Sequence, residues 1–236
     1  GLGDVYKRQE IIACSQNKGH WADIGGVVPG SFYVQAGDHF GEGLRITPVR
    51  VWSKGDFLKD VAQLIVSNTR APEVALGDLH AQSEATAVCE REVLRLVERY
   101  GKDTVVEAMQ ETQDYVERTV LERIKTLPQG TWETVDYLDN DPSTPEGMVP
   151  IRIKLTIDDE GIHYDLNGSA PAVATFLNSA YGTTHSSLYS GTKTFFPDVP
   201  LNSGFYRAVT ADLGPEGTVI NASWPHAVTG FCAGPH

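Results

Sequence analysis

Histidine and carboxylate side chains gather in a glycine-rich segment near the start of the chain. His20 and Asp23 are three residues apart, so both can project from one turn. An imidazole nitrogen and a carboxylate oxygen that converge in this way suit a borderline divalent metal such as Mn, Zn or Fe. Asp38 and His39 lie at the far end of the same segment, with Glu42 just behind them. A third ligand would have to come from such residues.

The residues leave a simpler interpretation open. A His-x-x-Asp pair arises often by chance, and a histidine in a loop is more often a hydrogen-bonded surface residue than a ligand. The glycines between Gly19 and Gly43 allow positive φ angles and close backbone approach. A loop of this length in a compact domain is usually functional or disordered.

A second polar group follows about fifty residues later. Asp78 and Gln82 are four apart and share one face of a predicted helix, and Arg70 precedes them. A planar guanidinium can hold a carboxylate or a phosphate with two hydrogen bonds, so these three residues are candidates for orienting a substrate. On these residues alone, the favoured alternative is a helix-start aspartate and a solvated surface arginine.

The composition excludes several functional classes. The 236 residues carry a formal net charge of −12, which disfavours binding to nucleic acid or to an anionic membrane surface. No apolar run is long enough to span a bilayer. There is no phosphate-binding P-loop and no dinucleotide fingerprint, so we do not expect this chain to hold ATP or NAD. Three scattered cysteines predict a reducing, cytoplasmic location.

Both ends of the sequence are atypical of a complete domain. Residues 1–9 show neither an amphipathic period nor a signal-peptide pattern, and we interpret them as a non-native leader. The other end, Phe231–His236, follows an apolar stretch without a stop signal. We therefore expect an internal fragment, truncated at both ends, with residues 10–236 as a single domain.

Helices are predicted for the middle of the chain. Apolar residues recur at helical spacing over Asp56–Asn68, over about Glu73–Tyr100 and over about Asp103–Lys125. Pro72 suits the first turn of the second helix, and Gly101 is a natural stop. Because only a short turn joins the two long helices, we expect them to pack as an antiparallel pair. The helical part covers about residues 56–127.

Strands are predicted on both sides of the helices. Glu10–Ser15 is expected as a short buried strand and Leu44–Trp52 as an edge strand. The strand-rich part covers about residues 130–236, with a hairpin turn at Asp158–Gly161. Further predictions are strands at 131–138, 151–157, 162–166 and 217–221, and a helix within 179–194. The order of strand, helices and strands indicates an α+β fold with mixed strands.

Short motifs spread over the chain resemble the hydantoinase B family. This family includes the B-type half of 5-oxoprolinase and the alpha-type subunits of acetone and acetophenone carboxylases. The matching runs are His20–Gly26, Pro29–Ser31, Glu42–Ile46 with Pro48, Asn68 with Arg70, Gly77–Leu79 with Ala81–Gln82, Asp165 with Gly168–Ser169, and Leu201–Asn202 with Gly204. They extend from about residue 10 to residue 230, and their number and order make the match specific.

The resemblance implies an enzyme subunit that works with a partner. Such chains assemble with an A-type subunit of actin-like ATPase fold, which binds ATP and phosphorylates a carbonyl or cyclic amide oxygen. The B-type chain then handles the activated intermediate. In the acetone carboxylase branch the resemblance implies Mn held by a His-x-x-Asp pair and a further histidine. Carried over, the pair is His20 and Asp23, and the third ligand is Asp38 or His39. A gapless match to Glu42 puts it at Asp38, where an aspartate replaces the histidine of the family.

Three functions follow as expectations. The first is the B-type chain of an ATP-dependent hydantoinase or 5-oxoprolinase, a hydrolase that opens a cyclic amide within a hetero-oligomer. The second is an alpha-type subunit of a ketone carboxylase. The third is a non-catalytic subunit that docks the A-type ATPase. In the first two, a divalent metal would act as a Lewis acid, with Arg70, Asp78 or Gln82 orienting the substrate.

Overall fold

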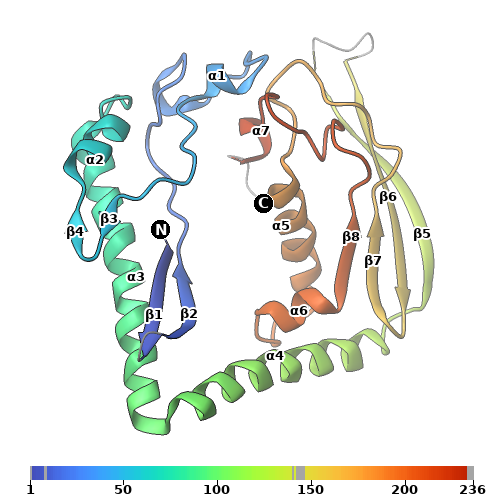
Figure 1. Cartoon of the computed structure of the whole chain (residues 1–236). Coiled ribbons are helices and arrows are strands. Elements are labelled where there is room, and N and C mark those ends of the chain that lie inside the picture. Colours follow the sequence, from blue (N-terminus) through green and yellow to red (C-terminus); the bar gives the residue numbers. More distant parts are fainter. Residues whose placement is uncertain (1, 8–9, 140, 142–146, 233–236) are drawn as a thin grey trace. The chain divides into compact units, whose positions relative to one another are not determined.

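The chain folds into two compact units. The computed structural model describes residues 2–7, 10–139, 141 and 147–232 (Figure 1). The first unit comprises Gly1–Ser31 and Gly43–Gln110, and the second comprises Phe32–Glu42 and Glu111–His236. Helices and a mixed sheet confirm the predicted α+β class. Among the described residues, no helix combines the length and the apolar content that a membrane span requires.

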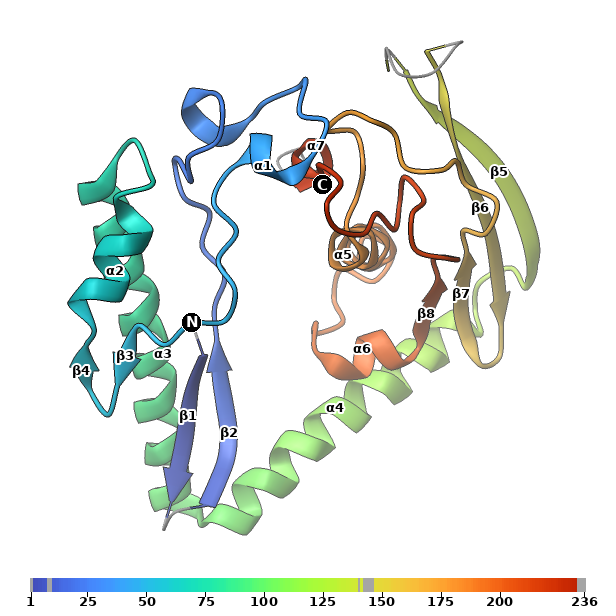
Figure 2. The same ribbon diagram turned by 45° about the horizontal axis from the view of Figure 1, so that its top comes forward.

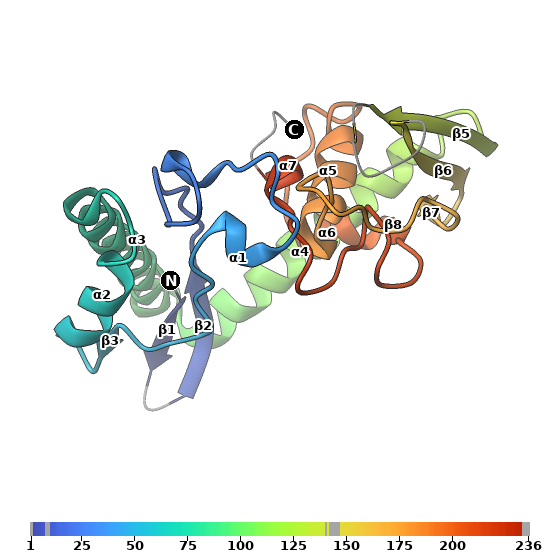
Figure 3. The same ribbon diagram turned by 90° about the horizontal axis from the view of Figure 1, so that it is seen from above.

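A hairpin and a long helix form the body of the first unit. Strands β1 (Leu2–Lys7) and β2 (Glu10–Gln16) pair antiparallel, and both contact α3 (Pro72–Tyr100). Figure 3 looks down α3 and shows the hairpin beside it. The predicted strand at 10–15 is therefore confirmed. The sequence pattern indicated no element over residues 1–9, whereas six of them form β1.

Smaller elements complete the first unit. Helix α2 (Lys59–Val66) contacts α3 and follows the short strands β3 (Trp52–Ser53) and β4 (Asp56–Phe57), which form a tight hairpin. The edge strand predicted over Leu44–Trp52 is wrong except at its last residue. This stretch is mostly exposed, and Pro48 has no N–H to donate to a sheet.

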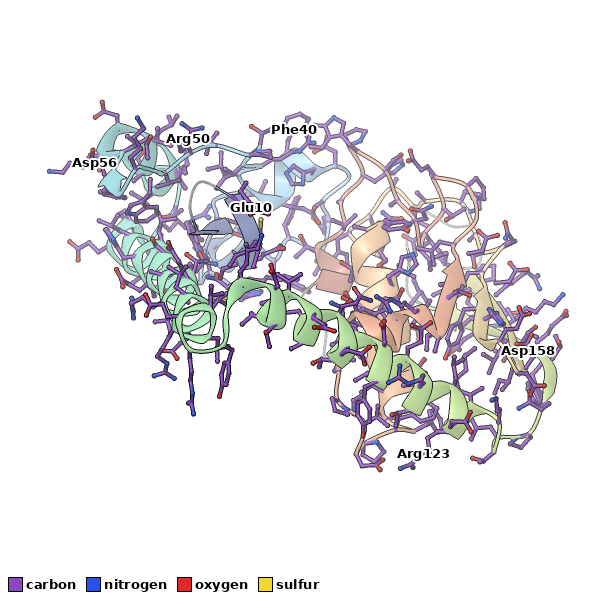
Figure 4. All side chains as sticks on the ribbon, turned by 60° about the horizontal axis from the view of Figure 1, so that its bottom comes forward. Glu10, Phe40, Arg50, Asp56, Arg123 and Asp158 are labelled. Carbon is purple, nitrogen blue, oxygen red and sulfur yellow. The ribbon has the colours of Figure 1, made fainter. Side chains whose placement is uncertain are left out.

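The two long helices begin and end where the sequence predicts. Pro72 occupies the first turn of α3, and Gly101, with φ 86°, ends it. Helix α4 (Lys102–Ile124) follows directly, and its Lys102 ammonium contacts the Glu10 carboxylate of β2 at 2.8 Å. Figure 4 labels Glu10. The prediction that the two helices pack as an antiparallel pair is wrong, because α3 packs on β1, β2 and α2 instead of on α4.

The physical reason for this correction lies in the apolar stripe of α4. Val116, Val120 and Ile124 are completely buried in the core of the second unit. Their neighbours there include Ile162, Phe196, Phe205 and Val209. The stripe is therefore already covered by other elements, and the short turn at residue 101 does not force a helical hairpin.

A four-stranded mixed sheet lies in the second unit. Strands β5 (Gly130–Leu138), β6 (Val149–Asp158) and β7 (Gly161–Asp165) form an antiparallel meander, and β8 (Val209–Asp212) pairs parallel with β7. Three of the predicted strands are thus confirmed. The strand predicted at 217–221 is wrong, because those residues form only isolated bridges. The sequence pattern does not predict β8, because its four residues are too few to show a clear alternation of apolar and polar side chains.

Helices connect the sheet strands of the second unit. Helix α5 (Tyr181–Lys193), viewed end-on in Figure 2, confirms the helix predicted within 179–194. Helix α6 (Ser203–Arg207) leads into β8, and α7 (Thr229–Cys232) follows near the end. In the glycine-rich segment, only η1 (Pro29–Ser31) of the first unit and α1 (His39–Glu42) of the second are regular.

Candidate functional site

Asp23 is a buried carboxylate whose oxygens are fully hydrogen-bonded within the first unit. Its Oδ1 accepts from the backbone N–H of Gly25 at 2.8 Å and of Arg70 at 2.9 Å. Its Oδ2 accepts from the N–H of Gly30 at 2.9 Å and from Arg70 Nη1 at 3.1 Å. Only 7% of Asp23 is exposed. A carboxylate has about four acceptor positions, so none is left for another ligand.

The Arg70 guanidinium also binds the backbone carbonyl groups of the same glycine-rich turn. Nη1 donates to the carbonyls of Gly25 at 3.2 Å and Val28 at 3.0 Å, and Nη2 donates to Gly26 at 2.7 Å. Gly25 has φ 88°, and a Cβ there would lie 2.7 Å from the carbonyl oxygen of Asn68. The turn thus needs glycine at this position to close around the guanidinium.

The hydrogen bonds dominate the titration of Asp23. Burial by itself would raise the pKa of the carboxyl, because it disfavours the charged form. The backbone N–H groups of Arg70, Gly25 and Gly30, together with the Arg70 guanidinium, outweigh burial and hold the pKa of Asp23 well below its usual range. The lowered pKa favours the charged form of Asp23, and its ion-pair partner is Arg70.

This arrangement bears on the predicted divalent metal. With all its acceptor positions filled and its charge neutralised, Asp23 does not fit the role of a metal ligand in the arrangement that the structure shows. Within the described residues, no three His, Cys, Asp or Glu side chains cluster closely enough to hold an ion. The metal itself stays a prediction.

A cavity of about 310 Å³ lies beside α3 in the first unit. One wall is the segment that follows β2, and the other is one face of α3. The lining residues are Asn17, Lys18, Gly19, His20, Trp21, Asp78, Ala81, Gln82 and Ala85. Its volume is at the small end of the range for small-molecule sites. The cavity therefore suits a compact ligand.

Gln82 ties the two walls of this cavity together. Its Oε1 accepts from Trp21 Nε1 at 3.2 Å, and its backbone carbonyl accepts from Asn17 Nδ2 at 2.5 Å. A Cβ on Gly19 would lie 2.6 Å from Gln82 Nε2, so glycine leaves the room that the amide occupies. The Gln82 side chain is thus held in one orientation.

Several other polar groups at the cavity have no partner among the residues that the structure describes. Asp78, Lys18 and His20 form no hydrogen bond or ion pair with any residue that the structure describes, and Gln82 Nε2 likewise has none. Asp78 and Gln82 are partly exposed, and Lys18 and His20 are exposed. The cavity therefore offers a carboxylate, an ammonium, an imidazole and an amide N–H to a ligand.

The remaining candidate ligands belong to the second unit. Asp38 Oδ1 accepts from the N–H of Phe40 at 3.0 Å and so caps the short helix α1, where Phe40 projects at the surface (Figure 4). Glu42 is 3% exposed, and its Oε1 accepts from the N–H groups of Val228 at 2.8 Å and Thr229 at 2.6 Å.

His39 lies beside Glu42, with its Nδ1 3.8 Å from Glu42 Oε2. Its ring packs against that of Trp224 at a centroid distance of 5.1 Å. The Nε2 atom of His39 is buried and makes no hydrogen bond to the described residues.

The structure thus sorts the sequence-predicted residues into three groups. His20, Asp78 and Gln82 meet at one cavity, Asp23 and Arg70 bind each other, and Asp38 caps a helix in the second unit. Trp21 and Lys18 were not predicted. Trp21 stands in the family-matching run His20–Gly26, and Lys18 stands two residues before His20. Neither position indicates the contact with α3 that gives Trp21 its role.

Comparison with known proteins decides the family. The sequence matches the profile described as hydantoinase B/oxoprolinase over residues 4–234. The chain belongs to this family. The hydantoinase B resemblance of the motifs is therefore confirmed, and it extends over nearly the whole chain.

Relatives in the hydantoinase B/oxoprolinase family include components of known enzymes. The chain is 36% identical to the beta subunit of the caprolactamase of Pseudomonas jessenii, over 94% of its own length and 38% of that protein. It is 30% identical to the B-type component of a putative D-/L-hydantoinase of Pseudomonas sp. strain NS671, over 94% of this chain and 39% of that one. The chain thus spans less than half the length of these relatives.

Solved structures share the fold of this hydantoinase B chain. The crystal structure of the ATP-dependent caprolactamase from Pseudomonas jessenii superposes with a TM-score of 0.85 at 34% identity, over 96% of this chain and 39% of that one. A nucleotide-free acetone carboxylase also gives 0.85, at 19% identity, over 98% and 32%. The second likeness supports the fold alone.

Proposed function

We propose that this chain is part of the B-type component of an ATP-dependent enzyme that opens a cyclic amide. An A-type partner binds ATP and phosphorylates the amide oxygen, and the B-type chain completes ring opening in a hetero-oligomer. The 36% identity to the beta chain of a caprolactamase carries this proposal. Homology to a putative hydantoinase and to 5-oxoprolinases supports the same reaction class.

The cavity beside α3 is the proposed place of action within this chain. It offers the Asp78 carboxylate and the His20 imidazole, which are the group types used in general acid–base catalysis. It also offers Lys18 and the Gln82 amide, which can bind oxygen atoms of a carbonyl or phosphoryl group. Arg70, bound to Asp23, contributes by holding the neighbouring glycine-rich turn instead of binding substrate.

Ketone carboxylation is the second candidate function. It is favoured by a 24% identity to the acetophenone carboxylase delta subunit of Aromatoleum aromaticum over 89% of this chain. A ketone lacks the N–H of a cyclic amide. The two functions therefore differ in whether the substrate can donate a hydrogen bond to the protein.

A substrate panel tests the proposal. The protein is purified in complex with its A-type partner and assayed with ATP against ε-caprolactam, hydantoin and 5-oxoproline, and against acetone with bicarbonate. We expect ATP-dependent ring opening of at least one cyclic amide and no ketone carboxylation. Carboxylation without any ring opening would favour the second candidate and overturn the first. Loss of product when ATP or the partner is omitted is the control.

A further inference from the structure

Two side chains on one face of α3 differ in their hydrogen-bonding character. Asp78 and Gln82 are four residues apart, so their Cβ atoms are about 6 Å apart on the helix surface. Both line the cavity opposite Trp21. A ligand in this cavity can therefore contact both at once.

Trp21 decides which end of the Gln82 amide is available. An indole nitrogen can only donate, so the atom 3.2 Å from Trp21 Nε1 is the Gln82 oxygen. The amide nitrogen lies against Gly19 and has no partner among the described residues. Gln82 therefore keeps its amide N–H groups as free donors among the cavity-lining groups, while its oxygen already accepts one hydrogen bond from Trp21.

Asp78 supplies the complementary acceptor. An ionised carboxylate can only accept hydrogen bonds, and within the described part of the chain Asp78 has no donor partner. Lys18 and His20 lie on the opposite wall and are exposed. The α3 face thus carries one fixed donor and one acceptor, one helical turn apart.

This pair matches the edge of a cis amide. In a small lactam ring the amide is locked cis, so its N–H and C=O point to the same side, whereas a linear secondary amide is almost always trans. We propose that Asp78 and Gln82 recognise this edge, with Asp78 accepting from the ring N–H and Gln82 Nε2 donating to the ring oxygen. The inference rests on the proposed function and adds the groups that select the substrate.

The same contacts serve the activated substrate. When the γ-phosphoryl group of ATP passes to the amide oxygen, the bond to ADP breaks, a new O–P bond forms and ADP leaves. No bond to nitrogen breaks, so the resulting O-phosphorylated iminium keeps its N–H for Asp78. The phosphoryl oxygens remain acceptors for the Gln82 amide. A ketone or an N-alkylated lactam lacks the N–H and leaves the Asp78 carboxylate without a donor, which lowers its affinity.

The test compares three ligands and two variants by equilibrium binding to the purified protein. ε-Caprolactam has N–H and C=O, whereas N-methylcaprolactam and cycloheptanone have only C=O. Asp78→Leu removes the acceptor at similar size. Gln82→Glu removes the donor while its carboxylate still accepts from Trp21. Glu84→Leu, on an exposed position of the same helix, is the matched control for Asp78→Leu.

The proposal predicts a specific pattern of dissociation constants. Asp78→Leu raises Kd for caprolactam about tenfold and changes the other two ligands by less than about twofold. Gln82→Glu raises Kd for all three by about tenfold, because all three share the carbonyl. Glu84→Leu changes none. Thermal unfolding of each variant verifies that it folds.

Several results would overturn the inference. These are equal effects of Asp78→Leu on all three ligands, no effect of either cavity variant, or no saturable caprolactam binding by the folded protein. The outcome is separable from that of the proposed function. If the complex opens cyclic amides but the binding pattern is absent, only the inference fails. If the pattern is present but the complex opens no cyclic amide, only the proposed function fails.

Discussion

Asp23 and Arg70 lie 47 residues apart in the sequence, yet two hydrogen bonds join them directly. Their residue types suggested a metal ligand and a substrate clamp, respectively. In the structure the carboxylate organises the N–H groups of a glycine-rich turn and the guanidinium organises its carbonyls. The pair is a scaffold for the segment that also carries His20.

This role predicts a loss of stability that does not depend on metal. Asp23→Asn and Arg70→Gln should each lower the free energy of unfolding by about 2 kcal/mol, because each leaves charge-assisted hydrogen bonds unmade. Their effects should not add, since both remove the same contacts. Urea unfolding with and without a chelator measures this. Arg95→Gln, in an exposed ion pair, should change stability by less than about 0.5 kcal/mol.

The pH dependence has a definite sign. The pKa of Asp23 is lower in the folded than in the unfolded chain, so its contribution is complete above the unfolded value of about 4. Below that pH the unfolded chain takes up the proton first, and the contribution falls. The stability difference between the wild type and Asp23→Asn should shrink from about pH 7 to about pH 3. A difference that persists unchanged, or destabilisation that disappears with the chelator, would contradict the scaffold role.

At the scale of elements, α6 is fastened to α4 by contacts that require glycine. Asn202 accepts from the N–H of Gly204 at 2.8 Å and donates to the carbonyl of Thr112 at 3.2 Å. A Cβ on Gly204 would lie 1.9 Å from the backbone oxygen of Gln113. This contact explains why an Asn-x-Gly motif occurs just before β8.

A pair of glycine substitutions tests this fastening. Gly204→Ala should destabilise the protein by about 2 kcal/mol or more, because backbone rather than a side chain must move. Gly182→Ala in α5 meets no atom within 4 Å and should be neutral or stabilising by up to about 1 kcal/mol. Chemical denaturation compares them. Equal effects of the two substitutions would show that α6 does not pack closely on α4.

The elements that sequence reasoning predicted well are those with a strong internal period. The α3 and α4 helices and the β5–β7 meander have such periods and clear stop residues, for example Gly101. Strand β8 has only four residues, too few for a clear period. The elements that α3 and α4 pack against depend on long-range contacts, which no local sequence pattern predicts.

At the scale of the whole molecule, part of the candidate site can be predicted from the sequence, because two of its residues lie at helical spacing. Asp78 and Gln82 were predicted as neighbours from helical spacing, and the cavity confirms that they share a face. That His20 meets them there follows from packing of the segment after β2 on α3, which the sequence does not record. The family was recognisable because many short motifs keep their order along the chain.

The proposed function gives residues of this chain a part in ring opening, and family membership and the cavity are the observations on which that proposal rests. A chain that only docks the ATPase is the alternative. A docking role requires the same partner, but it requires no contribution to the reaction from the side chains that line the cavity.

The most direct test of this claim is ATP-dependent ring opening by the complex with its A-type partner, comparing Asp78→Leu with Glu84→Leu. If the cavity acts on the substrate, Asp78→Leu should lower kcat/KM at least about a hundredfold while the complex assembles normally, and Glu84→Leu should match the wild type. Undiminished turnover in an intact Asp78→Leu complex would contradict the account and leave this chain a docking role.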